Sequence, residues 1–171
     1  MDAISSNHIN HRDFQTLERT MVINGVETRI LHPEANFDPE GILAKVKGEN
    51  NNSMVIKTTF GSTSVLFPGD ICEQAEEELI SRNMEDLPST VLVCPHHGSK
   101  SSSTMEFINR VNPQYVVITV GWRNRFNFPH SEVLERYRHQ GSHILRTDLD
   151  GAVAIRSDGK RLRVDSCRKH L

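Results

Sequence analysis

The chain has 171 residues, enough for one domain with a sizeable hydrophobic core. Its 36% hydrophobic and 25% charged residues are typical neither of a membrane-embedded nor of a disordered protein. The net charge of −2 excludes a global positive field that would capture nucleic acid, although it leaves room for a local basic rim. Three cysteines without a CxxC pair argue against a disulfide framework or a zinc ribbon.

The first part of the chain predicts a leader followed by two hairpins. Residues 1–18 are polar without periodicity, and we expect a disordered or fragmentary leader there, followed by a single, partial domain over 19–171. Asn24-Gly25 between β-branched runs predicts a β-hairpin over 21–31. A loop over 32–52 should follow, and then a second hairpin made of strands 53–60 and 63–67.

The second part predicts alternating helices and strands. We expect helices over 72–83, 104–111 and 132–140, and strands over 90–94, 115–120, 143–147, 152–156 and 161–164. Ser131 is expected to cap the last helix at its N-terminus, and Gly141 to end it. Hairpins followed by β-α-β units predict a layered α/β domain with a mixed sheet.

Polar residues that follow predicted strands are the candidate functional residues. Asp70 follows the strand that ends at Phe67, while His96 and His97 follow the strand over 90–94. His130 lies in the loop after the strand over 115–120. Open α/β sheets bind ligands at the carboxyl ends of their strands. Carboxylate and imidazole suit zinc or manganese, and such a metal can convert a bound water into hydroxide.

Each candidate has a structural alternative. Asp70 and Glu73 have the spacing of a capping box at the N-terminus of the following helix. His96 and His97 can be turn residues, and His130 can be a solvent-exposed loop residue.

The polar clusters nearby also have more than one interpretation. One residue of the run Ser99–Thr104 must cap the next helix, and the others can donate hydrogen bonds to an anionic oxygen. Arg123, Asn124 and Arg125 suit a phosphate clamp, or they simply solvate the surface. Cys94 ends a buried strand and is most simply a small core residue rather than a nucleophile.

Several motifs occur in an order that resembles a known family. They are Asn50–Val55, Phe67–Ile71, Pro95–Ser102, Asn112-Pro113, Asn127–His130 and Arg146–Ala152. Together they resemble the carboxyl-terminal metallo-β-lactamase-fold domain of the ComEC family of bacterial DNA-uptake proteins and its free-standing relatives. The resemblance runs from about residue 50 to residue 159.

The resemblance implies an αββα sandwich and a metal-dependent hydrolase, a nuclease acting on a DNA strand during natural transformation. It implies that Asp70 and His96 are metal ligands and catalytic residues, with one or two zinc or manganese ions, and that His97 is a neighbouring, second-choice ligand. It also implies that His130 lines the substrate pocket. The further candidate substrate-binding residues are Ser99, Ser101, Arg123, Arg125 and Asn127.

The family's main metal-binding signature, His-x-His-x-Asp-His, is absent, and the His8 to His11 segment does not replace it. We therefore expect that the amino-terminal portion of the sandwich is missing, that the ligand set is incomplete, and that one sheet has an unusually apolar face or an open edge. The partner would be the missing amino-terminal half or a second copy of the chain.

Two functional hypotheses follow. The first is a metal-dependent phosphodiesterase or nuclease that acts on DNA or on another phosphodiester. The second is an inactive remnant that folds with a partner or binds nucleic acid without cleaving it. We expect no membrane segment in this chain, and a location that is cytoplasmic for a free-standing protein or extracytoplasmic for a detached part of an uptake machine.

Overall fold

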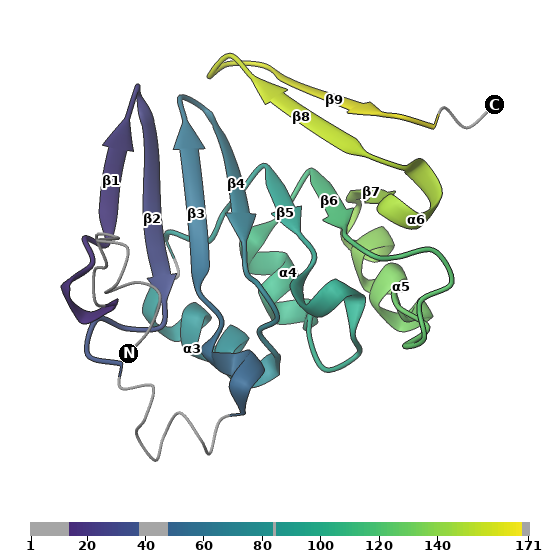
Figure 1. The fold of residues 1–171 in the computed structure, drawn as a ribbon, viewed down its shortest axis with the longest axis horizontal. Helices are drawn as coiled ribbons and strands as arrows, with labels where there is room; N and C mark the ends of the chain where they lie inside the picture. The colour runs from purple at the N-terminus through teal and green to yellow at the C-terminus, as the bar shows by residue number, and fades with distance from the viewer. Residues whose placement is uncertain (1–13, 38–47, 84, 169–171) are drawn as a thin grey trace, which may run out of the picture.

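A mixed sheet of seven strands, in the order β1-β2-β3-β4-β5-β6-β7, organises the part of the chain that the structure describes (Figure 1). The structure is a computed structural model that describes residues 14–37, 48–83 and 85–168. The strands are β1 (Thr20–Ile23), β2 (Val26–His32), β3 (Val55–Phe60), β4 (Thr63–Phe67), β5 (Val91–Val93), β6 (Tyr115–Ile118), β7 (His143–Arg146), β8 (Val153–Ser157) and β9 (Leu162–Ser166). The helices are α3 (Glu73–Asn83), α4 (Met105–Val111), α5 (Ser131–Gln140) and α6 (Thr147–Asp150), with short 3₁₀ helices η1 (Phe14–Thr16), η2 (Glu49–Asn52) and η3 (Pro95–Gly98).

The strand directions confirm the predicted mixed sheet. Strands β1 to β4 pair antiparallel, and β4 to β7 pair parallel. Asn24 and Gly25, with φ of 51° and 81°, connect β1 to β2. Positive φ at both central residues suits a tight hairpin turn, so the Asn-Gly prediction is confirmed.

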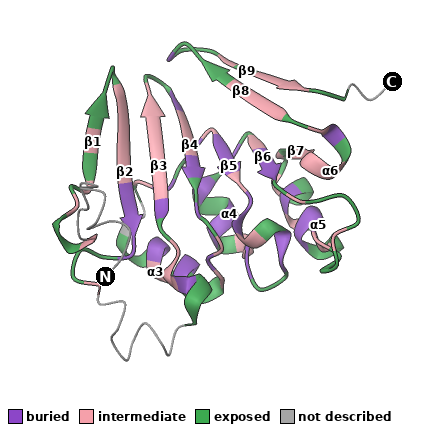
Figure 2. Cartoon of the chain, viewed as in Figure 1, coloured by how far each residue is buried: buried purple, intermediate pink, exposed green. Residues whose placement is uncertain are grey.

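The hydrophobic core lies between the sheet and helices α3, α4 and α5 (Figure 2). Leu66, Leu92 and Val116 stand side by side in the register of β4, β5 and β6, and all three are fully buried. Phe107 of α4 and Tyr137 of α5 belong to the same core. This packing fixes which face of each parallel strand points toward the helices.

The opposite face of the sheet is covered only in part by the described residues. The β8–β9 hairpin reaches across it, and its turn meets the β3–β4 turn, where the Ser62 amide donates to the Gly159 carbonyl at 2.7 Å. Under the hairpin lies an apolar cavity of about 440 Å³, whose lining includes Val65, Val93 and Val117. An apolar, partly open sheet face is what the resemblance implied for a sandwich without its other sheet. The sandwich itself stays a prediction.

Two helix starts differ from the predictions. Helix α3 begins at Glu73, whose amide donates to the Ser101 carbonyl at 2.9 Å, so the alternative interpretation of Asp70 and Glu73 as a capping box is wrong. Helix α5 begins at Ser131, with His130 at the N-cap position, so the expected cap at Ser131 is also wrong. The cause is tertiary, because the His130 amide donates to the Gly98 carbonyl and sets the start of the helix.

The segment after β7 also differs from the prediction. The expected strand over 143–147 ends at Arg146, and Thr147–Asp150 form the short helix α6. The Asp150 carboxylate accepts from the Arg146 amide at 2.6 Å and so stabilises this helical turn.

Residues 1–13, most of the expected leader, and residues 38–47 of the expected loop lie outside the described residues. Of the described leader residues, Phe14–Thr16 form η1, and the Phe14 ring contacts the Phe37 ring edge-on at 6.2 Å between centroids. Among the described helices, none has the length and apolar composition that crossing a membrane requires.

A buried carboxylate fastens the loop after η3 to helix α3. Glu76 is fully buried, and its two carboxylate oxygens accept from the amides of Ser103 and Thr104 at 2.5 and 2.8 Å. Arg136 of α5 donates to the Ser103 carbonyl, and the Tyr137 hydroxyl donates to the Ser103 hydroxyl. Burial raises the pKa of Glu76 to about 7, since desolvation outweighs the two amide hydrogen bonds; the charge of Glu73 raises it further.

This burial predicts a pH-dependent stability. Because the folded-state pKa of Glu76 lies above the unfolded-state value, its stabilising contribution is complete below about pH 4.5 and is lost as the pH rises toward 7. In urea titrations, the free energy of unfolding should fall by about 1.4 kcal/mol per pH unit across this window because of Glu76. The slope should flatten in Glu76→Gln and persist in Glu77→Gln, which alters an exposed glutamate of the same helix. Equal slopes in all three proteins would contradict the assignment.

Candidate functional site

Three segments that follow parallel strands converge at one edge of the sheet. Asp70 comes after β4, His96 and His97 after β5, and Thr119 begins the loop after β6. Together with residues of that loop, these four residues line a pocket of about 410 Å³. The structure thus brings Asp70 and the two histidines together, as their positions after the strands predict.

The backbone at the two histidines has a rare conformation. His96, His97 and Gly98 have φ of 46°, 55° and 84°, three successive residues in the left-handed region. The His96 amide donates to the Gly69 carbonyl, which ties this turn to the residue before Asp70. Left-handed backbone at non-glycine residues costs free energy and is concentrated at functional sites.

The side chains of His97 and Asp70 face each other in the pocket. Nδ1 of His97 lies 2.7 Å from the Thr119 carbonyl oxygen, which can only accept, so Nδ1 carries the proton. Nε2 of His97 lies 3.5 Å from Oδ1 of Asp70. In neutral His97 both of these atoms are acceptors, and a proton or a metal cation satisfies both. A backbone carbonyl on Nδ1 is also the usual second partner of a metal-binding histidine.

His96 has different neighbours. Its Nδ1 lies 3.5 Å from the Cys72 thiol, and its Nε2 lies 3.4 Å from the Asn50 side-chain amide. The edge of the Phe128 ring completes the contacts, at 5.8 Å between centroids. The family resemblance implied His96 rather than His97 as the metal ligand, whereas the geometry places Nε2 of His97 3.5 Å from Oδ1 of Asp70. Both assignments stay predictions.

The serine cluster is more internal than its polarity suggests. Ser99 is buried and lies 2.9 Å from Ser101, hydroxyl to hydroxyl. Ser101 is exposed and contacts the Cys72 thiol at 3.5 Å. Thr104 caps helix α4 by accepting from the Phe107 amide. A direct role in substrate binding therefore fits Ser101 better than Ser99.

The loop between β6 and α5 carries the remaining candidates. Arg123, Arg125 and Asn127 are exposed, and the partly buried His130 contacts the Phe128 ring edge-on. Each arginine lies over the aromatic ring next to it rather than over the pocket. Sequence reasoning missed these rings, Trp122 and Phe126, although each of the two arginines is adjacent to one of them in the sequence.

A divalent metal fits this site in ligand type but not in ligand number. Carboxylate and imidazole are ligands that zinc and manganese prefer. Among the described residues, however, no group of three or more His, Cys, Asp and Glu side chains could hold a metal ion. Cys94 offers no alternative nucleophile, because burial raises the pKa of its thiol to about 12. A metal ion at this site therefore stays a prediction, with Asp70 and the two histidines as its candidate ligands.

Comparison with known proteins agrees with the resemblance in part. The chain is 39% identical over 105 residues to "Competence protein ComA" of Neisseria gonorrhoeae, and 32% identical over 134 residues to "ComE operon protein 3" of Bacillus subtilis. The chain is similar to bacterial competence proteins. It is also 30% identical over 159 residues to "Recombination protein 2" of Haemophilus influenzae. No protein-family model matches the chain.

These matches cover much of this chain and little of each relative. They span 61%, 78% and 93% of this chain but 15%, 16% and 19% of the three relatives. The similarity therefore concerns one segment of much longer proteins. The metallo-β-lactamase fold and the hydrolase activity stay predictions.

The contact between η3 and the β6–α5 loop generates a stability prediction. A Cβ atom on Gly98 would lie 2.5 Å from Cβ of Pro129, and the φ of 84° disfavours any side chain. Gly98→Ala should lower the free energy of unfolding by roughly 1–3 kcal/mol in urea titrations. The matched control is Gly121→Ala, because no atom lies within 4 Å of its Cβ position. Equal stability of the two variants would contradict this packing role.

Proposed function

We propose that this chain is a DNA-handling domain of bacterial DNA uptake, with a phosphodiesterase-type site that the described residues form only in part. The similarity to competence proteins supports the biological setting. The pocket at the strand ends supports the position of the site. Asp70, His97 and His96 are the residues that would contribute to hydrolysis.

One observation carries the proposal, namely the approach of Nε2 of His97 to Oδ1 of Asp70 at 3.5 Å. Two facing acceptors form a natural place for a cation. A divalent metal there would supply Lewis acidity toward a phosphoryl oxygen. The protein's part is to hold the two ligands in place: Thr119 fixes the tautomer of His97, and Ser53 fixes the backbone at Asp70 by accepting from its amide at 3.1 Å.

A second candidate function is nucleic-acid binding without cleavage. The absence of a group of three metal-binding side chains in the described part of the chain favours it. The expectation that a missing amino-terminal half or a second copy completes the fold stays a prediction. Both candidates place DNA at the same pocket and differ in whether this chain alone cuts it.

Metal titration tests the site. Calorimetric titration with Mn²⁺ or Zn²⁺ should show binding that weakens about tenfold or more in Asp70→Asn and in His97→Ala. His139→Ala, which alters an exposed histidine of α5, should bind as the wild type does. His96→Ala decides whether the second histidine is also a ligand. Unchanged affinity in Asp70→Asn would contradict the assignment.

Cleavage separates the two candidate functions. End-labelled DNA incubated with the chain and Mn²⁺ should be cut by the wild type and not by Asp70→Asn if this chain is a hydrolase. DNA that is bound but left intact by the wild type would favour the second candidate. Equal cutting by both proteins would identify a contaminating nuclease.

A further inference from the structure

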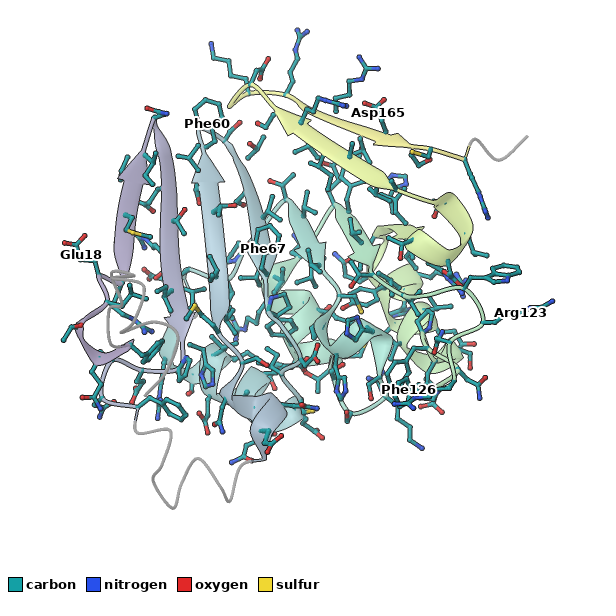
Figure 3. The ribbon with its side chains drawn as sticks, in the orientation of Figure 1. Glu18, Phe60, Phe67, Arg123, Phe126 and Asp165 are labelled. Carbon is teal, nitrogen blue, oxygen red and sulfur yellow. The ribbon has the colours of Figure 1, made fainter. Side chains whose placement is uncertain are left out.

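The loop between β6 and α5 presents two exposed aromatic rings, each accompanied by an arginine. Trp122 is 66% exposed and Phe126 is 55% exposed. The guanidinium carbon of Arg123 lies 5.7 Å from the centroid of the Trp122 ring, and that of Arg125 lies 4.7 Å from the centroid of the Phe126 ring. Arg123 and Phe126 are labelled on this loop in Figure 3. Each pair combines a flat apolar surface with a permanent positive charge.

The loop is held in shape from within. The side-chain oxygen of Asn124 accepts from the amides of Phe126 and Phe128 at 3.2 and 3.0 Å. Its side-chain nitrogen donates to the Phe128 carbonyl at 2.7 Å. These bonds fix the turn that carries the exposed rings, so a ligand that stacks on them pays a smaller ordering cost.

The aromatic rings continue from the surface into the pocket. Phe126 stacks on Phe128 with centroids 5.5 Å apart and an angle of 22° between the ring planes. Phe128 then contacts His96 edge-on. Both phenylalanines line the pocket that contains Asp70 and His97. A ligand that stacks on Phe126 therefore lies beside the candidate site.

We infer that Trp122 and Phe126 form a stacking platform for unpaired bases, with Arg123 and Arg125 neutralising phosphates, so that the site takes a single strand of DNA. The inference rests on the proposed function, which places DNA at this pocket. Every base has a π-face that can stack on an aromatic ring, whereas in a duplex neighbouring bases occupy these faces. No acidic residue occurs between residues 119 and 131, so nothing on the loop itself repels a phosphate backbone.

Binding without metal tests this inference apart from cleavage. Fluorescence anisotropy of labelled oligothymidylate in EDTA should show tighter binding of the single strand than of a duplex of the same length. Trp122→Ala and Phe126→Ala should each weaken binding of the single strand about tenfold, and Trp122→Phe should retain most of the affinity. Trp122 is the only tryptophan of the chain, so binding should also change its fluorescence directly.

Matched variants separate stacking from charge and from the hydrolytic site. Arg163→Gln removes an exposed arginine of β9 and should leave binding unchanged, whereas Arg123→Gln should weaken it. EDTA keeps metal-dependent cutting out of this measurement, so a loss of strand binding in these variants is separate from any loss of hydrolysis.

Two results would overturn the inference. Equal affinity for strand and duplex, with no effect of Trp122→Ala, would refute the platform and leave the proposed function standing. Binding to anionic phospholipid vesicles without any binding to DNA would refute both.

Discussion

The parallel register of β4, β5 and β6 is the constraint on which the candidate site depends. Leu66, Leu92 and Val116 pair across these strands and point into the same core. The segments that follow the three strands therefore leave the sheet at the same level. A shift of one residue in any strand would turn its apolar side chains to the other face, and burial therefore fixes the register strongly. Asp70 and His97 meet because the core aligns the strands that precede them.

The segment from η3 to α4, which contains the two histidines, is held by contacts to helices α3 and α5 and to the loop between β6 and α5. The Glu76 carboxylate binds two amides at the end of this segment, and Gly98 packs against Pro129 at its beginning. Burying Glu76 costs solvation free energy, which its raised pKa reflects. At the histidines themselves, the His96 amide donates to the Gly69 carbonyl, which ties their left-handed backbone to the residue before Asp70. Local stability and site geometry therefore depend on the same few residues.

Features that depend on a few neighbouring residues could be predicted from the sequence. Features that depend on contacts between distant residues could not. The Asn24-Gly25 hairpin and the polar residues after β4 and β5 could be read from the sequence because turn chemistry and strand length are local. The start of α5 depends on the Gly98 carbonyl, which lies far away in the sequence. The choice between His97 and His96 beside Asp70 depends on successive positive φ values, which no sequence pattern specifies. The shape of the β6–α5 loop likewise depends on the side-chain bonds of Asn124 to Phe126 and Phe128, which hydrophobic periodicity does not reveal.

The open sheet face and the candidate site involve the same strands. Phe67, Val93 and Val117 line the cavity on the open face, and each lies only a few residues before Asp70, His97 or Thr119. A layer of chain that covered this face would therefore approach the ends of β4, β5 and β6, beside the candidate site. Burial of these side chains would favour such packing by about 25 cal/mol per Å² of apolar surface. Packing on the open face and the geometry of the candidate site therefore depend on the same three strands.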